Sequence, residues 1–218
     1  MKKKVVNLIR ALFPKLYSRF NLYNRLIHQK NSFIYETGWV YSIQIRGVIN
    51  DLGDPIPWMN YSFIEFIKNR LSPSMDVFEY GSGYSTIFFS KYVKSIISVE
   101  YDKEWYDRIK PLVPLNSTVI YRSLDTNYVS SIRIFKKSFN IIIIDGRRRN
   151  DCLITCLESL NENGVVIFDD SFRSRYQESF ALMNKMGFRW LDFYGFKPGA
   201  YKMAQTTVFY RDNNCLEI

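Results

Sequence analysis

Four consecutive isoleucines, Ile141–Ile144, stand directly before Asp145 and constrain the fold more than any other feature of the chain. A strand without a polar face needs cover on both sides, which is typical of a central strand in a parallel sheet. The isoleucines belong to an apolar run at 139–144, and segments with helical spacing separate it from further apolar runs at 77–80, 96–99, 118–121 and 165–168. The alternation predicts an α/β fold with a doubly wound, mostly parallel sheet.

Two further apolar runs, 188–196 and 206–210, follow a helix predicted near 172–186 and bring the expected sheet to seven strands. The loop between them, around 197–201, is placed to close over a substrate. We expect residues 1–57 to form a helical N-terminal extension or lid, and residues 58–218 to form the ligand-binding domain. Ligands of such sheets bind at the carboxyl ends of the strands, so the residues that follow each run are the functional candidates.

The extension begins with an amphipathic helical pattern, in which Leu8, Ile9 and Leu12 share a face and basic residues lie elsewhere. Two interpretations fit this pattern: a helix packed on the domain, or a helix lying on a membrane surface. No stretch approaches the ~18 apolar residues of a membrane span. The aromatic residues that follow, together with Trp58 and Tyr61, either cover a bound cofactor or belong to the core.

The composition favours an anionic partner. The 218 residues carry a formal net charge of +9, from 30 Lys and Arg against 21 Asp and Glu. Nucleic acid, an acidic membrane surface and an anionic small substrate all satisfy this charge. The three cysteines lack the spacing of a disulfide framework, and no signal-peptide pattern is found, so a cytoplasmic protein is expected. A peripheral position at the inner membrane face is the alternative.

The run at 77–80 leads into a glycine turn of sequence EYGSGYST, residues 79–86, after which a helical pattern begins. Glycines in such a turn let the backbone approach a ligand, and the helix start offers free N–H groups. The next run ends at Glu100, 21 residues after Glu79, where a carboxylate can accept both ribose hydroxyls of a nucleoside. A dinucleotide-binding turn places a third glycine where Thr86 stands here, which disfavours hydride transfer.

The segment 77–102, VFEYGSGYSTIFFSKYVKSIISVEYD, resembles the first two strands of class I S-adenosylmethionine-dependent methyltransferases. The order of elements through residue 210 is similar too. The resemblance implies that the glycine turn holds the aminoacyl part of S-adenosylmethionine and that the acid after the second strand holds its ribose. The cofactor-binding residues that it implies here are Glu79, Gly81, Ser82, Gly83, Ser85, Thr86 and Glu100. Ser85 stands where the family often has a third glycine.

Two further acids complete the predicted cofactor site. Asp125, shortly after the third run, is a candidate for contact with the adenine amino group, and an ordinary solvated loop acid is the alternative. Asp145, at the end of the fourth run, is expected beside the sulfonium of the cofactor.

Acids end the fourth and fifth runs, with Asp145 after the isoleucines and Asp169 and Asp170 after 165–168. Neighbouring strand ends bring them together, and uncompensated buried charges are too costly to arise from packing alone. The arrangement resembles the metal-dependent O-methyltransferases, which implies Mg²⁺ held by Asp145, Asp169 and Asp170. Asp145 or Asp169 is then the catalytic base, directly or through the metal. Alternatively, Asp169 caps the following helix and Asp145 only lines the cofactor pocket.

Five arginines follow the same two strand ends, namely Arg147, Arg148, Arg149, Arg173 and Arg175. A guanidinium group suits bidentate capture of a carboxylate or phosphate. Their clustering predicts an anionic acceptor recognised by Arg147, Arg173 and Arg175, with scattered surface charge as the alternative.

The sequence predicts a methyltransferase that acts on the oxygen of a small-molecule or saccharide-like acceptor. Methylation of nucleic acid is disfavoured, because the chain has neither an Asn-Pro-Pro-Tyr or Asp-Pro-Pro-Tyr sequence nor a Pro-Cys nucleophile. Aminopropyl transfer is disfavoured because the arginines would repel a polyamine. The alternative from another class is a catalytically inactive methyltransferase-fold scaffold or nucleic-acid-binding module, which would tolerate the loss of Asp145 and Asp169.

Overall fold

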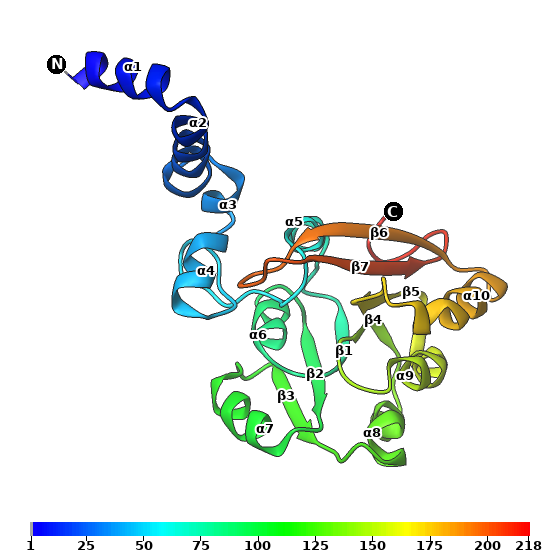
Figure 1. The fold of residues 1–218 in the computed structure, drawn as a ribbon. Helices are drawn as coiled ribbons and strands as arrows, with labels where there is room; N and C mark the ends of the chain where they lie inside the picture. The colour runs from blue at the N-terminus through cyan, green and yellow to red at the C-terminus, as the bar shows by residue number, and fades with distance from the viewer. Residues whose placement is uncertain (1) are drawn as a thin grey trace.

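A seven-stranded sheet forms the centre of the protein (Figure 1). The computed structural model describes the backbone of residues 2–218 and the side chains of residues 6–125 and 127–218. The strands are β1 (Asp76–Tyr80), β2 (Ser95–Glu100), β3 (Ser117–Tyr121), β4 (Phe139–Ile144), β5 (Leu160–Asp169), β6 (Arg189–Phe196) and β7 (Met203–Tyr210). Their order is β3-β2-β1-β4-β5-β7-β6. Strand β7 runs antiparallel to β5 and β6, and all the other neighbouring pairs are parallel. The prediction of a doubly wound, mostly parallel seven-stranded sheet is confirmed.

Helices precede the sheet and connect its strands. Those before the sheet are α1 (Lys2–Leu12), α2 (Pro14–Tyr23), the π-helical η1 (Asn24–His28), α3 (Phe33–Glu36), α4 (Trp39–Ile45) and α5 (Tyr61–Lys68). Those between strands are α6 (Tyr84–Ser90), α7 (Lys103–Ile109), η2 (Lys110–Leu112), α8 (Thr126–Ser130), η3 (Ser131–Phe135), α9 (Arg149–Cys156), η4 (Leu157–Ser159), η5 (Ser174–Tyr176) and α10 (Gln177–Lys185). The helix predicted near 172–186 is thus η5 followed by α10.

The four isoleucines of β4 divide between two hydrophobic cores, one on each face of the sheet. Ile142 and Ile144 belong to the core that contains residues of α8, α9 and α10. Ile141 and Ile143 belong to the core that contains residues of α5 and α6. All four are fully buried, and each contributes about 1.5–3 kcal/mol by burial. Cover on both faces explains why this strand has no polar positions.

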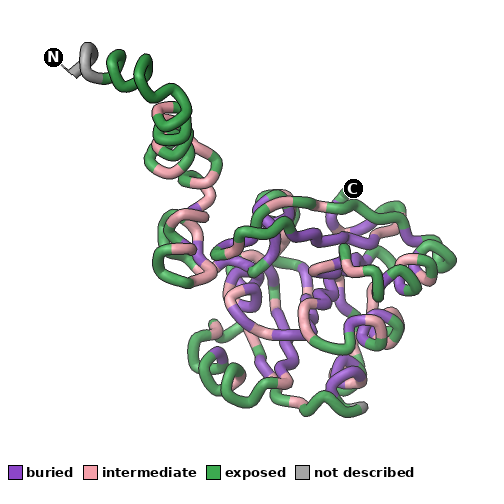
Figure 2. The backbone as a smooth tube through the Cα atoms, in the orientation of Figure 1, coloured by how far each residue is buried: buried purple, intermediate pink, exposed green. Residues whose placement is uncertain are grey.

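The N-terminal arm, which we define as residues 2–35, extends away from the sheet as a chain of short helices (Figures 1 and 2). Leu12, Leu16 and Phe20 are 62%, 63% and 62% exposed, and α2 buries none of its residues. The interpretation in which the N-terminal helix packs on the domain is therefore wrong. Among the residues that the structure describes, no helix has the length and apolar character needed to cross a membrane.

Candidate functional site

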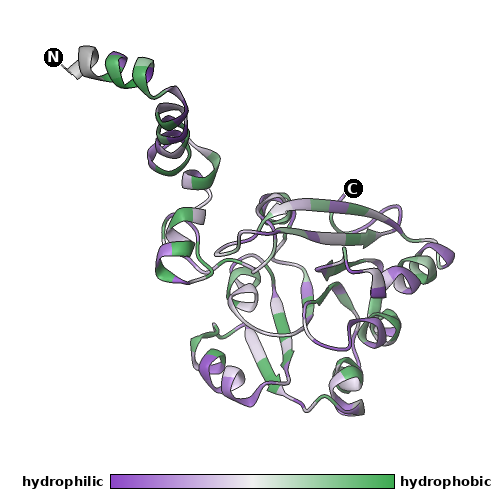
Figure 3. Cartoon of the chain, in the orientation of Figure 1, coloured by the Kyte–Doolittle hydropathy of each residue, from purple (hydrophilic) through white to green (hydrophobic). Residues whose placement is uncertain are grey.

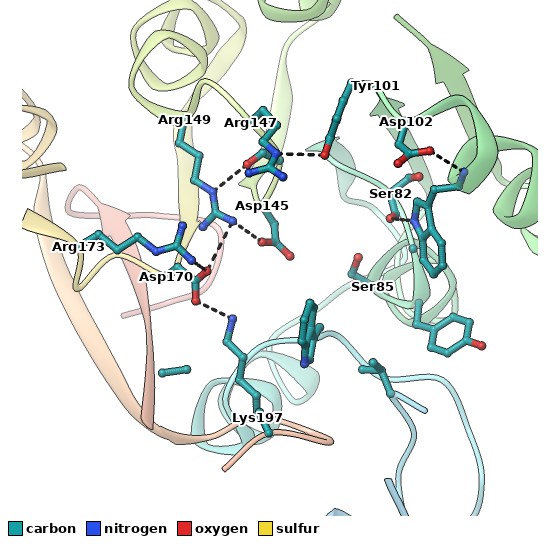
Figure 4. A pocket seen from close by; sticks show the side chains of 18 of the residues that line it. Ser82, Ser85, Tyr101, Asp102, Asp145, Arg147, Arg149, Asp170, Arg173 and Lys197 are labelled. Atoms are coloured by element: carbon teal, nitrogen blue, oxygen red, sulfur yellow. Dashed lines mark hydrogen bonds and ion pairs between the residues drawn. The ribbon is translucent and has the colours of Figure 1, made fainter. Parts of the chain in front are cut away.

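A cavity of about 1240 Å³ opens at the carboxyl ends of β1, β2, β4 and β5 (Figure 4). Its floor consists of the segments that follow these strands, around residues 82–85, 100–102, 145–151 and 170–173. The β6–β7 loop and a stretch of the N-terminal segment complete the wall. The strand order reverses beside β1, and a crevice at such a switch point is where open α/β sheets bind ligands.

The glycine turn after β1 adopts a conformation that requires glycine at its first position. Gly81 has a φ of +102°, and its N–H donates to the carbonyl of Val99 at 2.9 Å. A Cβ atom on Gly81 would lie only 3.1 Å from the carbonyl oxygen of Asp145. The N–H of Gly83 donates to Thr86 Oγ1 at 3.1 Å, which closes the turn onto α6. Of the predicted turn residues, Ser82, Gly83 and Ser85 line the cavity.

The carboxylate of Glu79 lies beneath this turn rather than in the cavity. Glu79 is buried, and its carboxylate accepts hydrogen bonds from the hydroxyls of Ser85, Thr86 (2.5 Å) and Ser98 (2.7 Å). Burial raises the pKa of Glu79, although the three hydroxyls act in the opposite direction. Its place in the structure suits a support for the turn, because the side chain holds the start of α6 against β1 and β2.

Glu100 joins the ends of β1 and β2 and reaches the cavity. One carboxylate oxygen, Oε2, accepts from the N–H of Ser82 at 3.1 Å and from its hydroxyl at 3.0 Å. The other, Oε1, accepts from the N–H groups of Tyr101 (2.8 Å) and Asp102 (2.9 Å). The indole N–H of Trp105 donates to the carbonyl of Ser82 at 2.7 Å. Because the hydroxyl of Ser82 can rotate away, a ribose hydroxyl can take its place on Glu100.

Asp125 is not brought into this cavity. It caps α8, where its carboxylate accepts from the N–H of Asn127 and from the hydroxyl of Ser123, both at 2.8 Å. These bonds lower its pKa, the backbone donor most of all. The carboxylate therefore has a structural role at the start of α8, which the sequence interpretation did not include.

A strand-end cluster of charges occupies the junction of β4, β5 and the β6–β7 loop. It consists of Asp145, Asp170, Arg149, Arg173 and Lys197, which Figure 4 labels, and of the buried Asp169. The ammonium of Lys197 lies 2.6 Å from Asp169 Oδ2 and 2.8 Å from Asp170 Oδ1. Arg149 Nη2 lies 2.9 Å from Asp145 Oδ1. Arg173 pairs with Asp170. The three acids are thus neutralised by cations of the chain itself.

Two left-handed residues explain how the cluster converges. Side chains of adjacent strand residues point to opposite faces, yet Asp169 and Asp170 both bind Lys197. The φ of +51° at Asp170 breaks the alternation and turns its side chain toward the same cation. Arg148, which precedes α9, also has a φ of +51°, and Arg149 then turns back to Asp145 and to the carbonyl of Gly146 at 3.0 Å.

The cluster does not support the predicted Mg²⁺ site. Lys197 and Arg149 contact the same carboxylate oxygens that would have to coordinate the metal, and Mg²⁺ demands near-octahedral oxygen coordination. No group of three or more His, Cys, Asp or Glu side chains in the described part of the chain is arranged to hold a metal. The residues present do not fit the ion, because internal cations take its place.

Of the two acids predicted to be catalytic, Asp145 faces the cavity and Asp169 does not. The side chain of Asp169 is 1% exposed, and it accepts from Thr206 Oγ1 at 2.7 Å as well as binding Lys197. It caps no helix, because Arg173 and Tyr176 hold the N-cap positions of η5 and α10. The side chain of Asp145 is 23% exposed and points into the cavity (Figure 4).

The pKa values within the cluster diverge. Burial, reinforced by the neighbouring Asp169 carboxylate, raises the pKa of Asp145 well above its usual 3.8, although Arg149 and Lys197 act in the opposite direction. For Asp170, burial also acts to raise the pKa, but Lys197, Arg149 and Arg173 outweigh it and the pKa is lowered. A carboxyl group with a raised pKa at the centre of a cavity is a candidate for proton transfer.

The three arginines predicted to bind substrate all line the cavity, but they differ in their partners. Arg173 is paired with Asp170. Arg147 and Arg175 donate to the phenol oxygens of Tyr101 and Tyr176, both at 3.0 Å. Within the described chain, no carboxylate oxygen lies within 4.0 Å of their guanidinium groups. Their charge is therefore available to an incoming anion.

The N-terminal segment and the β6–β7 loop are fastened to each other at the cavity rim. The indole N–H of Trp39 donates to the carbonyl of Ala200 at 2.8 Å, and that of Trp58 donates to Pro198 at 3.0 Å. The ammonium of Lys197 lies 5.7 Å from the centre of the Trp58 ring, and both residues line the cavity. Sequence reasoning placed this loop and Trp58 near the site, but it did not identify Lys197 or Arg149 as partners of the acids.

Comparisons with known proteins show similarity at the level of structure. The chain matches no protein family profile and no curated protein. A precorrin-6y C5,15-methyltransferase from Geobacter metallireducens aligns with a TM-score of 0.55 and 12% identity, over 69% of this chain and 87% of that one. An rRNA methylase from Streptococcus thermophilus aligns with a TM-score of 0.52 and 11% identity, over 68% and 93%. Spermidine synthase from Thermotoga maritima aligns with a TM-score of 0.54 and 16% identity, over 69% and 57%.

These proteins act on different acceptors by their names, so the similarity carries no substrate with it. At identities of 11–16% it establishes the arrangement of the sheet and helices. The α/β fold of this chain is the fold of the class I methyltransferases.

Proposed function

We propose that this protein is an S-adenosylmethionine-dependent methyltransferase that methylates a hydroxyl group of an anionic small-molecule or saccharide-like acceptor. One observation carries the proposal. A single cavity joins a glycine turn and a ribose-type acid, Glu100, to a carboxyl group of raised pKa, Asp145, and to a basic rim. Cofactor binding, proton transfer and recognition of an anion can therefore take place in one connected space.

The cofactor half of the cavity fits S-adenosylmethionine. Glu100 offers a carboxylate to the ribose hydroxyls, and Ser82 and Gly83 bring the backbone to the cavity surface. Drug-sized ligands occupy cavities of roughly 300–1,000 Å³, so a space of about 1240 Å³ admits the cofactor and part of an acceptor. When bound, the cofactor supplies an electrophilic methyl group.

Asp145 is the residue that we assign to proton transfer. A general base works best when its pKa lies near the operating pH, and burial together with Asp169 shifts the pKa of Asp145 in that direction. Arg149, held in place by the Gly146 carbonyl, fixes one oxygen of this carboxylate at 2.9 Å. The role of Asp145 is to accept the proton of the acceptor hydroxyl as the oxygen is methylated. Asp169 has a positioning role, because it holds Lys197.

The basic rim favours an anionic acceptor. Eight basic and five acidic side chains line the cavity, and Arg147 and Arg175 have no carboxylate partner in the described structure. Guanidinium groups bind phosphate or carboxylate in a planar, bidentate manner. The same charge argues against a polyamine acceptor, although spermidine synthase shares the fold. A screen of methyl transfer from labelled cofactor to phosphorylated and carboxylated hydroxyl compounds tests the proposal.

Replacing Glu100 with alanine is expected to weaken the binding of S-adenosylhomocysteine about tenfold to a hundredfold, as measured by calorimetry. Hydrogen bonds to a charged acceptor contribute about 1.5–3 kcal/mol, and the ribose hydroxyls would lose that acceptor. Glu104→Ala, which removes an exposed acid of α7 nearby, is the matched control and should leave the affinity unchanged. Equal affinity in the Glu100 and Glu104 variants would refute the assignment of Glu100.

Replacing Arg147 or Arg175 with alanine is expected to raise the KM for the acceptor about tenfold and to leave cofactor affinity unchanged. Each variant loses a cation that lines the cavity and has no carboxylate partner in the described structure. The dependence of KM on salt should also become weaker, since part of it arises from this attraction. Arg122→Ala removes an arginine that donates only to a backbone carbonyl in the described structure, and it serves as the control. A KM that stays unchanged in both cavity variants would show that Arg147 and Arg175 do not bind the acceptor.

A further inference from the structure

Almost the whole net charge of the protein resides in the N-terminal arm. The first 35 residues contain eight Lys and Arg and no Asp or Glu. Residues 36–218 contain the other 22 basic residues against 21 acidic ones, which leaves a net charge of about zero. The formal charge of +9 is therefore a property of the arm and not of the domain that contains the cavity.

The arm also exposes many large apolar side chains. They are Val6, Leu8, Ile9, Leu12, Phe13, Leu16, Phe20, Leu22, Tyr23, Leu26 and Phe33, each between 42% and 63% exposed. Figure 3 shows apolar and polar segments alternating along the arm, and Figure 2 shows that most of it is exposed. Soluble monomers rarely leave so large an apolar surface uncovered, which indicates that something binds it.

The apolar residues gather on one face of each of the first two helices. In α1, Leu8, Ile9 and Leu12 follow the spacing of three and four residues that places side chains on one side of a helix, and in α2 Leu16, Phe20 and Tyr23 do the same. The chain bends at Phe13, whose φ of −132° and ψ of 62° are not helical, so each of the two helices presents its own apolar face (Figure 1). Arg10, Lys15 and Arg19 alternate with these positions and are exposed.

We propose that the arm docks on an anionic phospholipid bilayer, lying in the interface with its apolar side chains inserted. The positive charge of the arm favours an anionic bilayer as its partner. Basic residues attract an anionic lipid surface, and inserted leucines and phenylalanines leave water at the same time. A second copy of the chain would bring two arms of eight positive charges together without a compensating acid. Nucleic acid would neutralise the charge but would leave the aliphatic side chains in water.

The inner end of the arm is attached to the cavity rim. Trp39, in the helix that follows the arm, donates to the β6–β7 loop at Ala200, and the residues directly after that helix, 46–48, line the cavity. An arm held by lipid thus keeps the cavity tethered to the bilayer at this rim. The inference concerns binding alone and does not depend on methyl transfer.

Co-sedimentation of the 218-residue protein with vesicles tests the proposal. We expect it to sediment with vesicles of equal parts phosphatidylglycerol and phosphatidylcholine, and not with vesicles of phosphatidylcholine alone. Binding should weaken strongly in about 1 M salt, where charges are screened beyond ~3 Å. The variant R10E/K15E/R19E should bind about 100-fold more weakly or not at all. The variant L12S/L16S/F20S keeps the charge and should lose binding as well.

A matched control separates the arm from general charge. K68E/K110E/K185E reverses three exposed lysines of the domain and changes the net charge equally, and it should bind like the unmodified protein. Equal loss in this control and in the arm variant would overturn the proposal. So would equal binding to both kinds of vesicle. An arm-dependent dimer in light scattering, or arm-dependent binding of double-stranded RNA, would also overturn it if vesicle binding were absent.

Discussion

Replacing Lys197 with methionine is expected to lower the free energy of unfolding by about 3–5 kcal/mol, because it leaves a buried carboxylate without its cation. The Lys197 ammonium binds Asp169, whose side chain is 1% exposed, at 2.6 Å. Asp170 keeps Arg149 and Arg173 in this variant, whereas Asp169 keeps only the hydroxyl of Thr206 among its described side-chain partners. Urea denaturation followed by circular dichroism measures the loss.

The loss of unfolding free energy in Lys197→Met should not vary with pH across the neutral range. Burial alone would lower the pKa of Lys197, but Asp169, Asp145 and Asp170 outweigh it and raise the pKa above its usual 10.5. A group with a raised pKa contributes stability that is complete below its unfolded-state value and is lost as pH rises through the folded-state value. On the alkaline side, the difference in unfolding free energy between the two proteins should therefore narrow only in strong alkali.

Lys202→Met is the control for the stability measurement, because it removes an exposed lysine from the same loop and should change stability by less than about 0.5 kcal/mol. Lys197→Arg keeps the charge and should recover part of the stability. If Lys197→Met were no less stable than Lys202→Met, the ion pairs of the strand-end cluster would not hold the β6–β7 loop to β5.

Replacing Asp145 with asparagine is expected to lower kcat by about 10²–10⁴-fold, the usual contribution of a general base. Asparagine matches the size of aspartate and can still accept a hydrogen bond from Arg149, so the cavity should keep its shape. For the unmodified protein, kcat should rise with pH to a plateau, with a midpoint above the ordinary aspartate value because the pKa of Asp145 is raised. That rise should disappear in Asp145→Asn.

The control for this experiment is Asp151→Asn, which neutralises an exposed acid on the cavity rim that pairs with Arg148. It should keep kcat within about twofold. Calorimetry should show equal binding of S-adenosylhomocysteine to both variants, which separates a loss of chemistry from a loss of binding. A kcat that is unchanged in Asp145→Asn would leave the alignment of the reactants as the source of catalysis.

The sheet and the glycine turn were predictable because their signals are local in sequence. An apolar run without polar positions, such as Ile141–Ile144, specifies burial on both faces wherever it occurs. Gly81 and Glu100 could be identified as site residues because Gly81 directly follows β1 and Glu100 is the last residue of β2. The strand boundaries were predicted less accurately. The predicted fifth strand begins at residue 165, whereas β5 begins at Leu160, which pairs with Phe139 of β4.

The partners of the acids were not predictable, because they depend on backbone conformations and contacts that are distant in sequence. Lys197 meets Asp169 across 28 positions in the sequence, because the β6–β7 hairpin places β7 beside β5 in the sheet. The left-handed residues Arg148 and Asp170 carry no sequence signal comparable to glycine. Three acids at strand ends therefore suggested a metal, whereas the chain supplies its own cations. The exposed arm shows the same limit: its amphipathic pattern predicts a helix but does not tell which partner covers it.

A crystal structure of the protein with S-adenosylhomocysteine tests the central claim most directly. We expect the ribose hydroxyls within about 3.2 Å of the Glu100 carboxylate, in place of the Ser82 hydroxyl, and the sulfur atom facing Asp145. The glycine turn should keep its conformation, since Glu79 already holds it in place. A cavity without the nucleoside at saturating concentration, with Glu100 still bound to Ser82, would contradict the account.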